Sequence, residues 1–246
     1  MKKALLTTLI CLVLGGGLSA ALAFDIPNIF SSGEQISSTA VNENFAALAA
    51  EVSIQGTPIT ASDIPLTITS GGTYYFAEDI FNDQVGGFKI LVTATGEKVT
   101  IDLNGHELDC GGVGNGFQAF NFNITHVTIK NGTIRDCAVA TITGDEYAVN
   151  GAHIHDLLVI NPSGVAFSLY GGGAKIEDCH VLGGDRGITQ SLGDGNIIKN
   201  NIFQTSNSDY VGIDVSASVV KDNVVRGYAT PISCGGPCVV VDNVEE

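Results

Sequence analysis

The chain has 246 residues, with 26 acidic against 11 basic side chains and a formal net charge of −15. This acidity excludes nucleic acid and anionic lipid surfaces as partners, because like charges repel. It also disfavours polyanionic glycans as ligands, unless a cation bridges the two charges.

The first 23 residues have the pattern of an export signal. Lys2 and Lys3 precede an apolar run over 4–14, and the small-x-small site Ala21-Leu22-Ala23 follows. The apolar run is too short to span a bilayer. We therefore expect cleavage at Ala23 and a mature protein that is secreted or periplasmic, with no membrane span. A leader of this kind is typical of bacteria.

Residues 24–63 are predicted to form an extended segment followed by a short helix. The run 40–52 contains neither glycine nor proline, and an apolar seam with heptad spacing runs through Val41, Phe45, Leu48 and Val52. Two heptads are too short to be stable alone. The helix is therefore expected either to cap the fold that follows or to associate with copies of itself.

From residue 64 the residues alternate between apolar and polar, as in strands. Strands are predicted over 66–69, 73–76, 89–95 and 98–103, with glycine-containing turns between several of them. We assign 64–246 to one domain, of which the part before 111 is the less regular end.

One pattern then recurs: aliphatic, any residue, Asn or Asp, two free positions, apolar. Copies begin at Ile129, Ile154, Ile176, Ile198 and Val220, with a partial copy at Val240, and the intervals are 25, 22, 22, 22 and 20. A fixed period of this length predicts a solenoid, in which each repeat buries its apolar face against its neighbours. The aliphatic residues are expected to stack as an inward column.

Two further features of the repeat are interpreted as structural. The Asn/Asp positions suit a bend, because these residues tolerate the left-handed conformation and hydrogen-bond local backbone. A second strand in each repeat begins at a glycine, which is expected to supply a sharp corner. These glycines are Gly116, Gly164, Gly187 and Gly212.

The period near 22, the Ile-x-Asn/Asp pattern and the segment Val-Thr-Ile-Asp-Leu-Asn-Gly-His at 99–106 resemble right-handed parallel β-helix proteins of the pectate-lyase-like superfamily. The resemblance covers 64–246. It implies an all-β, right-handed parallel β-helix, a solenoid of about seven coils with a short N-terminal helix. It leaves function open, since the superfamily includes polysaccharide lyases, glycoside hydrolases, epimerases, tailspikes and adhesins.

The resemblance implies that an enzyme of this fold would work on the outer face of one sheet, and the glycine-opened strands are the candidate. Alternation predicts two outward rows there, Ala166, Thr189, Asp214 and Ser168, Ser191, Ser216, Ser233. A hydrolase needs two carboxylates about 5–10 Å apart. Asp214 is the one catalytic candidate, unless loop acids enter the groove: Asp145, Glu146, Asp185, Asp194 and Asp209.

The other outer face carries a column of ionisable residues, Lys130, His155, Glu177, Lys199 and Lys221. These are candidates for glycan contact; the alternative is a solvated face of mixed charge. An apolar stripe beside them, Ile197, Val219 and Val239, suggests a contact surface between copies of the chain. Val41, Phe45 and Leu48 offer a second route to a homo-oligomer.

Five cysteines lie outside the leader. Cys110 and Cys137 fall near one turn and could pair, and Cys234 and Cys238 could close a small loop, which leaves Cys179 for buried packing. Their spacing does not support a zinc site.

The sequence therefore predicts a secreted structural or glycan-contacting β-helix without an evident catalytic centre. The alternative is a polysaccharide lyase or glycoside hydrolase acting on an extracellular polysaccharide. A third option is a binder that uses its acidic loops to hold calcium; no other cofactor is expected.

Overall fold

A computed structural model of the chain describes residues 42, 56–83, 87–119, 126–143, 151–206 and 209–245. The export signal over 1–23, the side chains of Val41, Phe45 and Leu48, and the loop acids Asp145 and Glu146 lie outside these residues. Of the helix predicted over 40–52, only Asn42 is described, and it is helical. The chain divides into two compact units, Met1–Gln55 and Gly56–Glu246.

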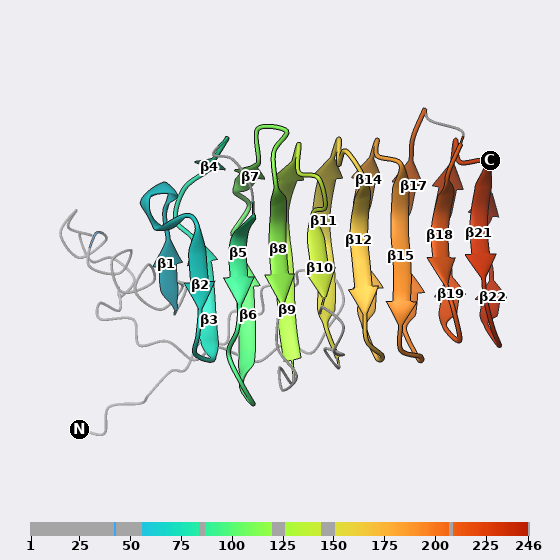
Figure 1. Ribbon diagram of the computed structural model, residues 1–246, viewed down its shortest axis with the longest axis horizontal. Helices are drawn as coiled ribbons and strands as arrows, with labels where there is room; N and C mark the ends of the chain where they lie inside the picture. The colour runs from blue at the N-terminus through green and yellow to red at the C-terminus, as the bar shows by residue number, and fades with distance from the viewer. Residues whose placement is uncertain are drawn as a thin grey trace, which may run out of the picture. The chain divides into compact units, whose positions relative to one another are not determined.

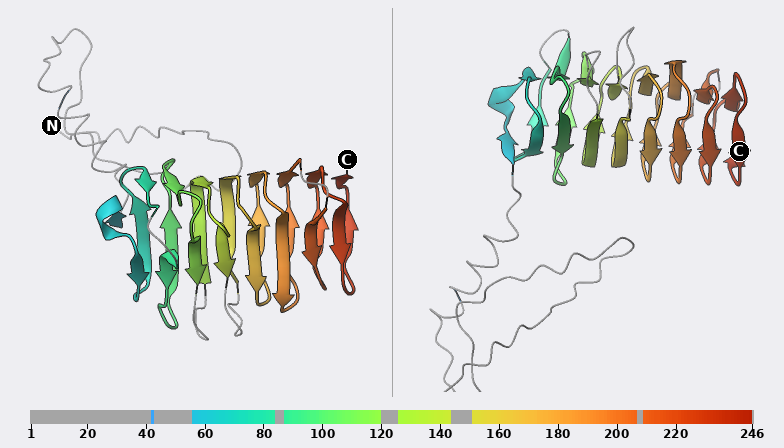
Figure 2. Two further views of the ribbon diagram at one scale, coloured as in Figure 1. Left: turned by 45° about the horizontal axis from the view of Figure 1, so that its top comes forward. Right: turned by 90° about the horizontal axis from the view of Figure 1, so that it is seen from below.

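The second unit is an all-β parallel solenoid of about seven turns. Its described strands form one sheet of 15 strands and one of eight, and every strand pair is parallel. Figure 1 shows these strands stacked side by side along one axis, and the two views in Figure 2 show the same order of turns. The parallel solenoid predicted from the repeat is confirmed.

The fifteen-stranded sheet has two arms that meet at a bend. The first arm follows the order β1 Thr57–Ile59, β3 Gly72–Phe76, β6 Lys98–Asp102, β9 His126–Arg135, β11 His153–Ile160, β13 Lys175–Glu177, β16 Ile197–Lys199, β19 Val219–Lys221 and β22 Val239–Val241. The second arm contains β4 Ile80–Phe81, β7 Glu107–Asp109, the later halves of β9 and β11, β14 His180–Leu182, β17 Ile202–Gln204, β20 Val224–Arg226 and β23 Val244–Glu245.

The eight-stranded sheet contains the strands that the sequence predicted to open with glycine, and its order is sequential. It comprises β2 Leu66–Ile68, β5 Phe88–Val92, β8 Asn115–Ala119, β10 Thr141–Thr143, β12 Val165–Tyr170, β15 Arg186–Leu192, β18 Val211–Val215 and β21 Thr230–Cys234. A single 3-10 turn, η1 Ala61–Asp63, connects β1 to β2. Because β1 already pairs with β3, the strands begin before residue 64.

The bend between the two arms is formed by residues in the left-handed conformation. Their φ angles lie between +53° and +61°, at Asn104, Asn131, Asp156, Asp178, Asn200, Asp222 and Asp242. Short polar side chains accept this conformation at lower cost than β-branched ones. The structural interpretation of the Asn/Asp positions is confirmed, and Asn104 extends it by one turn.

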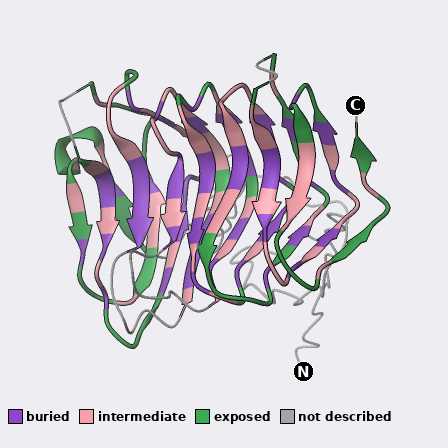
Figure 3. Ribbon diagram, turned by 45° about the vertical axis from the view of Figure 1, so that its right-hand side comes forward, coloured by how far each residue is buried: buried purple, intermediate pink, exposed green. Residues whose placement is uncertain are grey.

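The aliphatic residues of the repeat form one buried column along the first arm. Strand register stacks Ile129, Ile154, Ile176, Ile198, Val220 and Val240 in succession. Ile154, Ile176 and Val220 are at most 1% exposed. Val240 is 43% exposed because no further described turn covers it, and Figure 3 shows buried residues running through the stack up to this last turn.

A second interior column is polar. Asn201, Asn223 and Asn243 follow the bend residue in successive turns, and the first two are fully buried. Asn201 Oδ1 accepts the Cys179 amide at 3.0 Å, and Asn201 Nδ2 donates to Asn223 Oδ1 and to the Ile176 carbonyl, both at 3.0 Å. Each buried amide side chain thus bridges neighbouring turns, which satisfies groups that would be costly to bury unpaired.

Space, and not backbone freedom, explains most of the glycines that open the eight-stranded sheet, since a Cβ on Gly116, Gly187 or Gly212 would lie 2.5 Å or less from another atom. Gly116, Gly164, Gly187 and Gly212 all lack a positive φ, so their predicted role as sharp corners was wrong. A Cβ on Gly187 would point into the interior and lie 2.5 Å from Phe203 Cδ1. The large ring of Phe203, which is fully buried, therefore excludes any side chain at this position.

Candidate functional site

The outer face of the first arm carries the predicted column of ionisable side chains in register. We call Lys130, His155, Glu177, Lys199 and Lys221 the charged row. Register places each beside the next, and Asp102 on β6 precedes Lys130. Each follows an inward Ile or Val and precedes a left-handed residue, so strand alternation and the bend together fix its direction.

Glu177 is the centre of this row. Its side chain is only 12% exposed, and it lies within hydrogen-bonding distance of His153 Nε2 at 2.8 Å and of Lys175 Nζ. Lys199 Nζ approaches the other carboxylate oxygen at 3.4 Å. Burial opposes ionisation of Glu177, but the hydrogen bonds from Lys175 and His153 outweigh it and lower its pKa to about 2. The carboxylate is therefore charged throughout the physiological range.

Two histidines lie beside Glu177 on β11. The rings of His153 and His155 have their centroids 4.3 Å apart, and His155 Nδ1 lies 2.7 Å from Asp156 Oδ2. Burial lowers the pKa of His153, although its hydrogen bond to Glu177 acts in the opposite direction. His153 is therefore neutral at pH 7, and it is held against the carboxylate without adding a charge.

The two ends of the row are also paired. Lys130 Nζ lies 3.0 Å from Asp102 Oδ2, and Lys221 Nζ lies 3.2 Å from Asp222 Oδ2. Burial disfavours the charged form of Asp102, but hydrogen bonds from the Asn104 amide, Lys130 and Asn131 keep its pKa lowered. The outer face is thus a lattice of fixed donors and acceptors.

Sequence reasoning placed His153 near this column but missed two further members of the lattice, Asp102 and Lys175. His153 and Lys175 precede His155 and Glu177 by two residues, and residues at this spacing share one face of a strand. The same alternation that identified the charged row therefore contained the signal for both.

The outward row of the eight-stranded sheet differs from the prediction. Ser168 pairs with Thr189, Thr189 with Asp214, and Asp214 with Ser233, so these four residues form one row. Ala166 does not face outward; it is fully buried. The predicted rows were wrong because Gly187 and Ile188 both face the interior, which breaks the strict alternation on which the prediction depended.

Asp214 is half-buried between two hydroxyl side chains, Thr189 on β15 and Ser233 on β21, not beside a second carboxylate. Of the other predicted members, Ser191 is an extra residue where the register shifts between β12 and β15. Ser216 follows β18, and its amide donates to Gln190 Oε1 at 3.1 Å.

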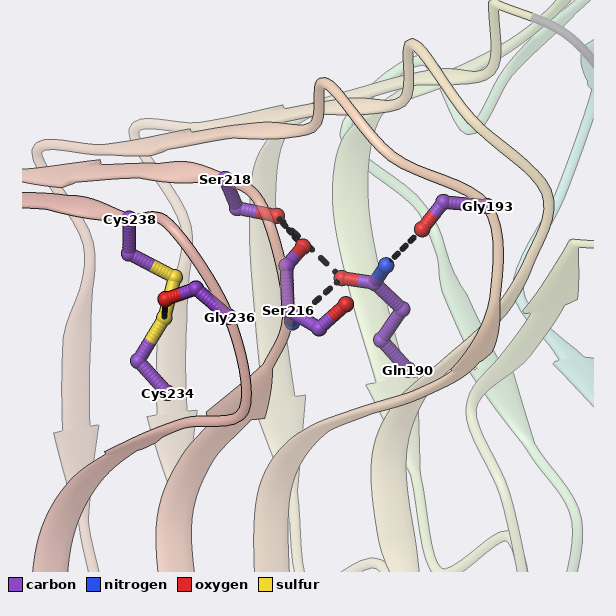
Figure 4. The surroundings of a disulfide bond; sticks show 7 residues. All are labelled: Gln190, Gly193, Ser216, Ser218, Cys234, Gly236 and Cys238. Atoms are coloured by element: carbon purple, nitrogen blue, oxygen red, sulfur yellow. Dashed lines mark hydrogen bonds between the residues drawn. A yellow bond between two sulfur atoms is a disulfide. The ribbon is translucent and has the colours of Figure 1, made fainter.

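Figure 4 shows the hydrogen bonds of Gln190 to residues at this end of the sheet, in the surroundings of a disulfide. Gln190 Oε1 also accepts Ser218 Oγ at 3.2 Å, and Gln190 Nε2 donates to the Gly193 carbonyl. Ser218 Oγ lies 2.7 Å from the Ser216 carbonyl. These contacts connect successive turns, which is a structural role.

The cysteines form two disulfides, Cys110–Cys137 between adjacent turns and Cys234–Cys238 within one loop. Cys179 is free and buried, and burial raises the pKa of its thiol to about 12. The thiol is therefore inert at physiological pH.

Among the described residues, no group of three or more His, Cys, Asp or Glu side chains is arranged to hold a metal ion. In the same part of the chain, no helix is both long and apolar enough to cross a membrane. Comparison with family models, with curated proteins and with solved structures finds no match to this chain.

Proposed function

We propose that this protein is an exported, non-catalytic β-helix of the right-handed pectate-lyase-like superfamily that contacts a glycan with the outer face of its first arm. The observation that carries the proposal is the charged row, in which ionisable side chains from five consecutive strands stack in register around Glu177. A polysaccharide presents hydroxyl groups at regular intervals. A row of side chains that repeats from strand to strand can contact those hydroxyl groups at the same kind of regular interval.

The lattice supports sugar binding because its groups are held in place before a ligand arrives. A lysine ammonium has three donors, so an ion pair with one carboxylate leaves others for ligand hydroxyls. Glu177 is fixed by His153 and Lys175, so little side-chain entropy remains to be lost on binding. Adjacent strands place equivalent groups about 4.8 Å apart along the axis.

The non-catalytic part of the proposal is supported by the eight-stranded sheet. Asp214, the catalytic candidate, has Thr189 and Ser233 as its row neighbours, whereas glycoside hydrolysis uses two carboxylates. The alternative is a polysaccharide lyase or glycoside hydrolase, which predicts release of reducing ends or unsaturated products. Loss of such turnover in Asp214→Ala would contradict the non-catalytic assignment.

Export is supported by the leader and by the two disulfides, since disulfides persist in oxidising compartments. We therefore propose a secreted or periplasmic location. Recovery of the full-length chain in the cytosolic fraction, with its leader intact and its cysteines reduced, would count against it.

Binding can be tested by titrating soluble polysaccharides into the protein in a calorimeter and comparing two variants. Lys199→Gln removes one ammonium from the charged row, whereas Arg226→Gln removes the same charge from β20 on the second arm. We expect the first variant to bind more weakly by about fivefold and the second to match the wild type. Equal affinities in all three proteins would refute the assigned face.

A further inference from the structure

An apolar row covers the last three turns of the first arm, and on β16 and β19 it lies beside the charged row. Ile197, Val219 and Val239 are in register and face outward, and Ile197 and Val239 are 39% and 54% exposed. On β16 and β19 they precede Lys199 and Lys221 by two residues, which places the two rows on one face about 7 Å apart. In the earlier turns the equivalent positions are polar, Thr128, His153 and Lys175.

The charge of this face is already balanced within the protein. Each of the four lysines on β9, β13, β16 and β19 contacts a carboxylate: Lys130 with Asp102, Lys175 and Lys199 with Glu177, and Lys221 with Asp222. The bend adds further acids at Asp156, Asp178 and Asp242. Asp156 and Asp178 directly follow members of the row in the chain, and salt screens such short separations little, because the screening length is about 8 Å at physiological salt.

An anionic polysaccharide would therefore gain little attraction from lysines that internal carboxylates already neutralise, and it would be repelled by the nearby acids. A neutral polysaccharide is not repelled by these acids, and its hydroxyls can share the remaining donors and acceptors of each ion pair. The net charge of −15 acts in the same direction, since it repels anionic polymers and leaves neutral ones unaffected.

From these two observations we infer that the ligand is a neutral polysaccharide lying along the solenoid axis over β16, β19 and β22. The inference rests on the proposed function and names the ligand class and its place. The C–H faces of the sugars cover Ile197, Val219 and Val239, and their hydroxyl edges reach Lys199, Lys221 and Glu177.

A second copy of the chain is the competing occupant of the apolar row. A stable protein interface buries about 800 Å² per partner. On β16 and β19 the row is one side chain wide and has the charged row along one border, a shape that suits a linear polymer better than a globular partner.

The test measures the affinity of the full chain for two sets of soluble polysaccharides, each at low and at high salt. The neutral set contains glucans, xylans and mannans. The anionic set contains polygalacturonate and alginate. We expect a neutral polysaccharide to bind with an affinity that does not depend on salt. Val219→Thr keeps the β-branched shape but removes apolar contact, and we expect it to weaken binding about fourfold. Val224→Thr makes the same change on β20 and should bind like the wild type.

The outcomes separate the two proposals. Binding of uronans alone, weakened by salt, would leave glycan contact standing and overturn the neutral ligand. If a neutral polysaccharide binds Val219→Thr as tightly as the wild type, or if Val224→Thr weakens its binding equally, the assigned position is overturned. A dimer in light scattering that dissociates in Val219→Thr would make a second copy the occupant. Failure to bind any ligand of either set would contradict the proposed function itself.

Discussion

His153 on β11 lies diagonally across from Glu177 on the neighbouring strand β13, with Nε2 of the histidine 2.8 Å from a carboxylate oxygen. This contact links two consecutive turns on the outside of the solenoid, at the point where Lys175 and Lys199 also reach the same carboxylate. Glu177 therefore contributes to stability as well as to the proposed binding face.

Replacing Glu177 with Gln should destabilise the fold by roughly 2 kcal/mol, because two ammonium groups lose their anionic partner. Urea unfolding at pH 7 measures the change. Asp214→Asn removes the same charge from the eight-stranded sheet and should change the free energy of unfolding by less than about 0.5 kcal/mol. Equal effects of the two substitutions would show that Glu177 has no special role.

The stability of the wild-type protein should fall in two stages as the pH is lowered. His153 has a pKa below its ordinary 6.5 in the fold, so below pH 6.5 the unfolded chain takes up a proton that the folded protein resists. Glu177 has a pKa of about 2 against an ordinary 4.5, so its contribution is complete above pH 4.5 and is lost between pH 4.5 and 2.

Thermal unfolding followed across this pH range tests both stages. Other carboxylates also titrate at acid pH, so the difference between wild type and Glu177→Gln is the informative quantity. We expect that difference to shrink as the pH falls from 4.5 towards 2, where Glu177 becomes protonated. A difference that is independent of pH down to 2 would contradict the lowered pKa of Glu177.

Asn201→Ala should destabilise the protein by about 2–3 kcal/mol, because it leaves the buried Cys179 amide and the Ile176 carbonyl without the side-chain partner each now has. Asn200→Gly is the matched control at the adjacent position. Its side chain is exposed, and glycine accepts the left-handed φ of +58°, so we expect little change. Chemical denaturation compares the two, and a control that is as unstable as Asn201→Ala would argue against the buried ladder.

Gly187→Ala should destabilise by more than about 1 kcal/mol, since the added methyl group meets the ring of Phe203 and the Gly212 carbonyl. Gly235→Ala adds the same methyl group where the nearest atoms are 3.8 Å away, and its φ is not positive. It should be neutral. We expect Gly187→Ala to have a lower melting temperature than Gly235→Ala. Similar melting temperatures would mean that the interior around Gly187 can relax to accommodate the methyl group.

Local conformation explains how much of this architecture is predictable from the sequence. A left-handed residue is restricted to a few residue types, so the Asn/Asp positions from Asn131 to Asp242 revealed the bend and the period together. Alternation then fixed the inward Ile and Val residues and the outward charged row. Each of these features depends on no more than the neighbouring residues in the chain.

The remaining features depend on contacts between turns. Alternation failed at Gly187 because the chain places two consecutive residues inside, next to Phe203. The buried ladder of Asn201, Asn223 and Asn243 was missed because the repeat pattern left the position after the bend free, although their 22- and 20-residue spacing repeats the period. The contact between Glu177 and His153 depends on the register of β11 with β13, which no single strand encodes.

The central claim is that a glycan binds to the first arm, and methyl NMR during titration with a neutral polysaccharide tests it most directly. Our account predicts shifts for the methyl groups of Ile197, Val219 and Val239, with those of Ile142 and Leu192 on the eight-stranded sheet unchanged. Shifts confined to Ile142 and Leu192 would place the ligand on the face that carries Asp214 and would contradict it.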